Sequence, residues 1–272
     1  MRKQKLFIAI ASLLIAVVVL AGCSSTPKEQ TAYELVKSAV EKTTALDSSE
    51  MNLNMNMKMS LMGMTVEIPM KYSIKSAKEG EDTIALANME MTVTGQSVKA
   101  DIFVDKDYVY INEPNSNAKI KVSLKDDLAK TYNVKSFSES IIKTLPEDIL
   151  KDVTVTKDDN GNRTVDVQIS EEKFNELFKG YIDSALSGAL SEISETDTTI
   201  KFSNTKVNIT VDKNGYISKY NLAFDMNMKM EMQGITMDIN ASCDSVCSFV
   251  NPGTKVVVER PADLDTYQEI SE

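Results

Sequence analysis

The chain has 272 residues, of which 42% are hydrophobic and 26% are charged, and its net charge is −10 at pH 7. This acidity disfavours binding to nucleic acid and electrostatic attraction to anionic lipid headgroups. The sequence contains no histidine, which removes the commonest general base, the nucleophile pairs that depend on it, and imidazole ligands for metals. We therefore expect no enzymatic activity, no catalytic residues, no cofactor and no metal site.

Residues 1–22 have the features of an export signal, with a basic start and an apolar run from Leu6 to Leu20. The ending Leu20-Ala21-Gly22-Cys23 resembles the lipobox of bacterial lipoproteins, in which the cysteine is lipidated and becomes the first mature residue. An ordinary cleaved signal and an uncleaved membrane helix are the alternatives, but the apolar run is short for a membrane span. We predict lipidation of Cys23 and anchoring at the extracytoplasmic face of the cell membrane.

Residues 23–31 are polar and suit a short tether, and a helix is predicted over about Ala32–Leu46. Thr31 and Glu34 have the spacing of a capping box at the start of this helix. Its apolar stripe consists of Tyr33, Val36, Ala39, Val40 and Leu46. We expect this stripe to cover one face of a sheet.

The segments Met51–Ile68 and Leu222–Ile239 are two copies of one pattern, displaced by 171 positions. In both copies apolar residues, mostly methionine, alternate with polar residues, which is the period of a half-buried strand. If Met62-Gly63 and Gln233-Gly234 are two-residue hairpin loops, every inward pair is apolar, and a shift of one residue would bury lysines. The predicted pairs are Leu61 with Met64, Met59 with Val66, Met57 with Ile68, Met55 with Met70, Leu53 with Tyr72, Met51 with Ile74, Met232 with Ile235, Met230 with Met237, Met228 with Ile239, Met226 with Ala241, and Phe224 with Cys243.

Pro69 falls opposite Asn56 in this register, with its missing N–H directed towards the next strand, so we expect a sheet edge or a bulge there. Further alternating runs predict a meander of strands. They are Ile84–Val93, Val98–Val104, Tyr108–Ile111 and Ile120–Leu124. Residues 125–151 lose the alternation, and we predict one or two helices there.

A hairpin is predicted from Val153–Thr156 and Thr164–Ile169. Its turn, residues 158–162, is rich in Asp and Asn, but the glycine position and the lack of a closing Glu argue against a calcium loop. Ser170 then caps an amphipathic helix, which is either packed on the sheet or a movable lid. Its apolar residues are Phe174, Leu177, Phe178, Tyr181, Ile182, Ala185, Leu186 and Ala189.

Strands resume at Ile200–Val211, at Tyr216–Met232 and from Ile235 onward. Cys243 and Cys247 would be about 13 Å apart on a straight strand, which is too far for a disulfide. A disulfide between them therefore requires the chain to turn at Asp244-Ser245. A disulfide and two buried thiols are both compatible with an extracytoplasmic protein.

Together these elements predict an α+β domain over residues 32–272, dominated by antiparallel strands and with an internal pseudo-repeat. The lipobox and tether, the helix Ala32–Leu46, and the stretches Phe103–Asn112, Thr210–Phe224 and Phe249–Asp265 resemble Gram-positive lipoproteins of the broad LolA/LppX-like superfamily. The resemblance implies a half-barrel, in which helices cover the concave apolar face of a curved antiparallel sheet. In some members this form holds the acyl chains of lipids or lipoproteins. The pseudo-halves are about 32–125 and 126–272.

The methionines have three interpretations: plain core packing, the lining of a hydrophobic ligand site, or soft-metal ligands for Cu(I). Burial explains such apolar strands better than metal binding does. We predict that a lipid-like ligand lies between sheet and helices, lined by Met55, Met57, Met59, Leu61, Ile68, Phe224, Met226, Met228 and Met230. The alternative is a non-enzymatic scaffold or sensor of the cell envelope, which recognises a protein partner and holds no small ligand.

Overall fold

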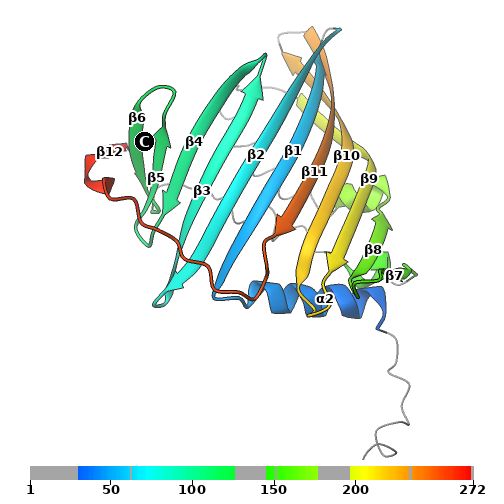
Figure 1. The fold of residues 1–272 in the computed structure, drawn as a ribbon. Helices are drawn as coiled ribbons and strands as arrows, with labels where there is room; N and C mark the ends of the chain where they lie inside the picture. The colour runs from blue at the N-terminus through cyan, green and yellow to red at the C-terminus, as the bar shows by residue number, and fades with distance from the viewer. Residues whose placement is uncertain are drawn as a thin grey trace, which may run out of the picture. The chain divides into compact units, whose positions relative to one another are not determined.

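Alternating segments of the sequence form the strands of one large sheet in the computed structural model (Figure 1). The structure describes residues 30–61, 63–125, 145–150, 152–176, 197–232 and 235–270. Within these ranges, twelve strands lie in the order β12-β6-β5-β4-β3-β2-β1-β11-β10-β9-β8-β7. Neighbouring strands are antiparallel, except that β12 runs parallel to β6. The sheet belongs to the compact unit Ala32–Glu272.

The strands are much longer in the centre of the sheet than at its edges. They are β1 (Ser48–Leu61), β2 (Met64–Glu79), β3 (Asp82–Val93), β4 (Gln96–Val104), β5 (Tyr108–Glu113), β6 (Ala118–Ser123), β7 (Val155–Lys157), β8 (Arg163–Gln168), β9 (Asp197–Val211), β10 (Ile217–Met232), β11 (Ile235–Phe249) and β12 (Gln268–Ile270). The described helices are α2 (Ala32–Thr44), α4 (Glu147–Leu150), the 3₁₀ turn η2 (Leu264–Thr266) and residues 171–176.

The described molecule is therefore mostly β rather than the predicted α+β, because its helices are short beside strands of up to 16 residues. The helix predicted over Ala32–Leu46 is confirmed as α2, and the strands of the meander are confirmed as β3 to β6. Much of the helix predicted after Ser170, most of residues 125–151, the signal peptide and Cys23 lie outside the described residues.

The predicted register of both methionine hairpins is confirmed at every pair. Met57 lies opposite Ile68 in β1–β2, and Met228 lies opposite Ile239 in β10–β11. The two hairpins also pair with each other, since β1 and β11 are antiparallel neighbours that place Met57 opposite Cys243. The two copies of the pattern therefore form one continuous four-stranded centre.

Pro69 marks an edge, as its sequence position predicts. The β2–β3 ladder ends at the pair of Met70 with Met91, so Met64–Pro69 is paired with β1 on one side and with no described strand on the other. A proline at this boundary removes the N–H that another strand would use.

One face of the sheet, here called the helix-side face, is covered at the β8–β11 end by α2, α4 and the helical residues 171–176. The buried residues of this first core are Ala32, Leu35, Val36, Ala39, Val40, Leu145, Leu150, Val165, Val167, Ile169, Phe174, Phe202, Val207, Ile209, Val211, Ile217, Tyr220, Leu222 and Cys247. A second core on the same face, at the β3–β6 end, contains Ala87, Ile102, Val109, Ile111 and Val122.

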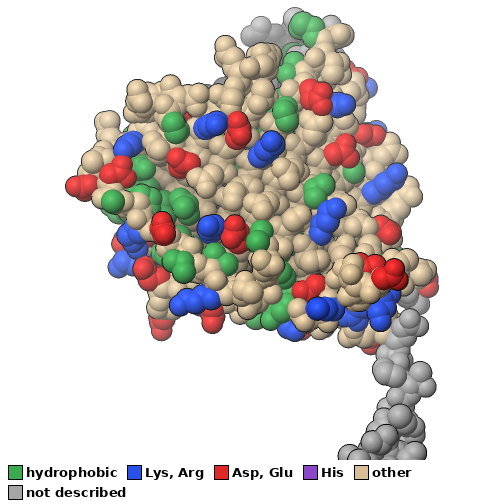
Figure 2. Space-filling model, in the orientation of Figure 1, with side chains coloured by type: hydrophobic (Ala, Val, Ile, Leu, Met, Phe, Trp, Pro, Cys, Tyr) green, Lys and Arg blue, Asp and Glu red, His purple; other side chains and the backbone are tan. Residues whose placement is uncertain are grey.

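The opposite face is crossed by a C-terminal segment, residues 255–267, here called the strap (Figure 1). Its Val258 and Tyr267 are buried against Ile84, Phe103 and Tyr110, which alternate with the residues of the second core. The chain continues from the strap into β12, which completes the sheet at β6. Figure 2 shows this face, on which charged side chains of both signs are scattered and hydrophobic side chains are visible between them.

Candidate functional site

Pairing between the hairpins produces a surface of half-buried apolar side chains, here called the methionine face. Its residues are Met55, Met57, Met59, Val66, Ile68, Met70, Tyr72, Met89, Met91 and Met228, all partly exposed. They lie on the helix-side face, on β1, β2, β3 and β10.

Register brings these side chains together across the strands. Met91, Met70 and Met55 lie directly opposite one another on β3, β2 and β1. Such pairs have Cβ atoms about 5 Å apart, so their side chains are in contact range. The surface is therefore continuous along several strands and across them.

The methionine face lies between the two cores and belongs to neither. Its ten residues are absent from the first and second cores, and from the side chains packed against them, within the part of the chain that the structure describes. Core packing by the described residues therefore does not account for these methionines.

Of the nine side chains predicted to line a site, five belong to the methionine face: Met55, Met57, Met59, Ile68 and Met228. Phe224 and Met226 lie on the same face but pack against the first core, where Phe224 contacts the rings of Phe174 and Phe202. Leu61 and Met230 have the predicted register, but their side chains lie outside the described residues. The predicted lining omits the other five residues of the methionine face. Val66, Met70 and Tyr72 were placed inward only by the predicted register of the hairpin, and Met89 and Met91 lay in a predicted strand whose alternation with polar residues was a usable signal.

The charged side chains that alternate with the methionines lie on the other side of the sheet. Lys58 pairs with Glu67 at 3.8 Å, and Lys229 pairs with Asp238 at 3.7 Å, all of them at positions that alternate with the methionines. Among the described residues, the polar side chain of the methionine face is Tyr72, and burial raises the pKa of its phenol above the ordinary value of 10.0.

Cys243 and Cys247 are free, buried thiols. β11 continues without a turn through Asp244-Ser245, so the chain reversal that a disulfide requires is absent and the disulfide alternative is wrong for this structure. Burial, with a smaller contribution from the carboxylate of Asp244, raises the pKa of Cys243 to about 11. Burial raises the pKa of Cys247 to about 12. Both thiols are therefore protonated and unreactive near neutral pH.

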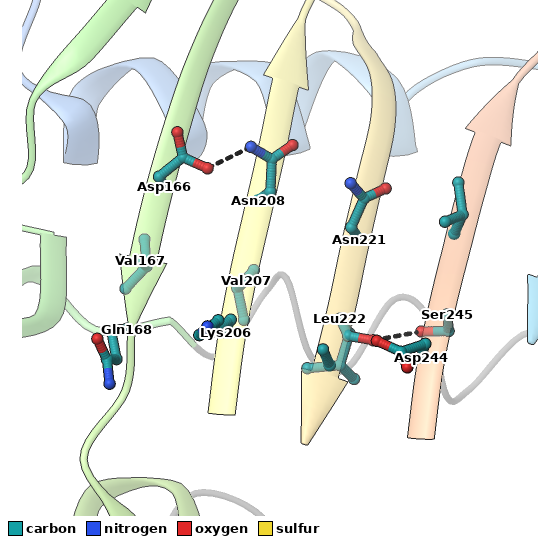
Figure 3. Close-up of a pocket in the computed structure, with 12 residues that line it drawn as sticks. Asp166, Val167, Gln168, Lys206, Val207, Asn208, Asn221, Leu222, Asp244 and Ser245 are labelled. Atoms are coloured by element: carbon teal, nitrogen blue, oxygen red, sulfur yellow. Dashed lines mark hydrogen bonds between the residues drawn. The ribbon is translucent and has the colours of Figure 1, made fainter. Parts of the chain in front are cut away.

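A polar depression of about 660 Å³ lies on the opposite face, over β8, β9, β10 and β11 (Figure 3). Asn208 donates a hydrogen bond to Asp166, and Asn221 follows in the same row across the strands. The side-chain oxygen of Asn221 is buried and has no hydrogen-bond partner among the described residues. Its lining includes the charged side chains of Asp166, Lys206 and Asp244, so it suits a hydrophobic ligand less well than the uncharged methionine face does.

No helix in the described part of the chain is both long enough and apolar enough to cross a bilayer. Within the same ranges, no three acidic or cysteine side chains are grouped as a metal site would require.

The turn at residues 158–162 is a hairpin turn, as predicted. The Asp158 carboxylate accepts hydrogen bonds from the backbone N–H groups of Asn160 and Asn162, both at 2.9 Å.

A family model described as "Family of unknown function (DUF6612)" matches residues 31–263. The chain belongs to this family. The match with DUF6612 includes every described strand except β12, and therefore the whole methionine face. No curated protein matches the chain.

Two solved structures are similar to this DUF6612 member. A DUF1329 family protein from Desulfovibrio piger ATCC 29098 is 11% identical, with a TM-score of 0.26, over 84% of this chain and 95% of that one. A candidate AttH protein from Nitrosomonas europaea is 5% identical, with a TM-score of 0.24, over 76% of this chain and 52% of that one. At these TM-scores neither likeness bears on the site.

Proposed function

We propose that this protein is a membrane-anchored extracytoplasmic lipoprotein that binds a hydrophobic, lipid-like ligand on the methionine face. The observation that carries the proposal is the set of ten half-buried side chains between two packed cores, with no charged group among them. Covering apolar surface contributes roughly 25 cal/mol per Å², so an acyl chain laid on this surface gains binding energy without displacing a charged group.

The choice of methionine supports a flexible apolar ligand. An unbranched, polarizable thioether adapts to irregular shapes better than a β-branched side chain does. The methionine face combines several such side chains in contact range, whereas the first core relies largely on Val, Ile and Leu. A surface of this composition suits acyl chains of variable length and unsaturation.

The finer architecture of this proposal is a LolA/LppX-like half-barrel, in which the ligand lies between the curved sheet and helices on its concave side. α2 and the helical residues 171–176 support it, because they pack on the helix-side face next to the methionine face. Lipidation of Cys23 would hold this domain at the membrane, and two acyl chains suffice for stable anchoring.

Native mass spectrometry with solvent extraction tests the proposal on residues 23–272 carrying Cys23→Ser. We expect a co-purifying lipid, and we expect Met57→Lys or Met228→Lys to reduce its amount by roughly tenfold or more, because each places an unpaired charge on an apolar surface. Ser60→Lys adds the same charge on the opposite face of β1 and should leave lipid binding unchanged.

Protein that is free of lipid, even after incubation with lipids of the cell envelope, would contradict the proposal. The second candidate function is then a scaffold or sensor that recognises an envelope protein. The observation that favours it is the polar depression around Asn208 and Asn221, where the exposed side chains of Asp166, Lys206 and Asp244 can hydrogen-bond a partner's surface.

A further inference from the structure

The methionine face has one polar group whose chemistry restricts the ligand. Tyr72 lies directly opposite Leu53 of β1 and Met89 of β3, and its neighbours on its own side of β2 are Met70 and Ile74. An apolar residue therefore adjoins the phenol ring in each direction within the sheet. Tyr72 itself is half-buried, and a ligand that covered its hydroxyl would have to accept a hydrogen bond from it to avoid the cost of burying an unpaired polar group.

The Tyr72 hydroxyl has no hydrogen-bond partner among the described residues. Tyrosines at the ends of the sheet differ from it: the hydroxyl of Tyr110 reaches the carboxylate of Asp105, and that of Tyr108 reaches Glu269, each at 3.5 Å. The raised pKa of Tyr72, which results from burial, agrees with a phenol that stays protonated and available as a donor.

No cation accompanies Tyr72 on the described part of the methionine face. The nearest lysine on its own strand, Lys71, is the adjacent residue and so belongs to the opposite face of β2. An ionised carboxylate or phosphate in this position would lack a counter-charge in an apolar environment, which is unfavourable. A neutral acceptor such as an ester carbonyl avoids that cost.

We propose that Tyr72 donates a hydrogen bond to the ester carbonyl oxygen of an acyl lipid whose chain lies on the methionine face. This inference rests on the function proposed above and narrows its ligand to neutral acyl esters, at the expense of free fatty acid anions. Tyr72 then determines specificity: the methionines supply affinity for any hydrocarbon, and the phenol selects the chain that carries a carbonyl.

Paired ligands and a paired variant test the role of the hydroxyl. Residues 23–272 with Cys23→Ser contain the whole compact unit Ala32–Glu272 and would be titrated with monoolein and with glyceryl monooleyl ether, which lacks the carbonyl. Tyr72→Phe removes only the hydroxyl. Tyr267→Phe, in the strap on the opposite face, is the matched control, and diphenylhexatriene reports hydrocarbon binding that needs no hydrogen bond.

We expect the unsubstituted site to prefer the ester over the ether by roughly three- to tenfold, the range of one net hydrogen bond, and to bind oleate more weakly than monoolein at pH 8. Tyr72→Phe should abolish the ester preference and leave diphenylhexatriene binding unchanged, while Tyr267→Phe should keep both.

Equal binding of ester and ether, or an ester preference that survives in Tyr72→Phe, would overturn the role of Tyr72 while binding itself stands. Binding of neither monoolein nor diphenylhexatriene would instead overturn the proposed function, and this inference with it.

Discussion

At the scale of single residues, one hydroxyl joins the helix that covers the sheet to the strand below it. Thr43, in the last turn of α2, is 7% exposed, and its Oγ1 accepts a hydrogen bond from the backbone N–H of Ile217 at 2.9 Å. Ile217 is the first residue of β10 and is itself buried. The bond therefore satisfies a backbone donor that α2 would otherwise cover.

Thr43→Val tests this bond, because valine has nearly the same shape but no acceptor. We expect the free energy of unfolding, measured by urea denaturation, to fall by about 1–3 kcal/mol, which is the cost of a buried donor left without a partner. Thr43→Ser keeps the hydroxyl and should lose clearly less stability. Equal losses in the two variants would show that the methyl group, and not the hydrogen bond, matters at this position.

At the scale of elements, the hairpin of β1 and β2 depends on the backbone of its turn. Gly63 has a φ of +80°, and a Cβ atom built on it would meet no atom within 4 Å. Glycine is therefore required here because of the backbone conformation, and not because neighbouring atoms would crowd a side chain. This turn sets the register that places Met57 and Met59 on the methionine face.

Gly63→Val should lower the free energy of unfolding by about 1–2 kcal/mol, because β-branched residues disfavour a positive φ. Gly63→Asn should cost less than half as much, since asparagine tolerates this conformation. Chemical denaturation of both variants measures the difference. A valine variant as stable as the asparagine variant would contradict the dependence of the hairpin on this backbone geometry.

At the scale of the whole molecule, the strap is held by an ion-pair network that joins residues far apart in the sequence. Arg260 donates hydrogen bonds to Asp105 and to Glu79, both at 2.9 Å, and its guanidinium lies over the ring of Phe103. Burial alone would raise the pKa of Asp105, but the backbone N–H groups of Asp107 and Tyr108, together with Arg260, lower it below its ordinary 3.8.

A lowered pKa in the folded state means that the ionised carboxylate stabilises the fold. This contribution is present above the unfolded value, near pH 4, and is lost as the pH falls through the lower folded pKa. Asp105→Asn should therefore reduce stability by about 1–3 kcal/mol at pH 7, and the difference from the unsubstituted protein should shrink towards pH 2. Urea denaturation across this pH range measures it.

Limited proteolysis of the Glu259–Arg260 bond by a glutamate-specific protease reports whether the strap has been released, and we expect faster cleavage in Asp105→Asn. Glu79→Gln, which changes the more exposed partner of the same arginine, should have a smaller effect because a surface ion pair contributes little. A constant difference between Asp105→Asn and the unsubstituted protein from pH 7 to pH 2 would contradict the role of the carboxylate charge.

The sequence alone determined the parts of the fold that depend on local chemistry. Alternation identified the central strands, Gly63 and its counterpart located the hairpin turns, and a register shifted by one residue was excluded because it would bury Lys58. It also identified five of the ten methionine-face residues. The physical reason is that strand period, turn geometry and cross-strand pairing are encoded within some twenty neighbouring residues.

Only the tertiary structure decided which distant segments meet. The pairing of β1 with β11, the addition of Met89 and Met91 to the methionine face, and the ion pairs of Arg260 join positions that carry no local signal of one another. The continuity of β11 decided that Cys243 and Cys247 are separate thiols. These outcomes depend on the order of strands in the sheet. An alternating pattern does not determine that order, because a half-buried strand can pair with any other strand that buries the same face.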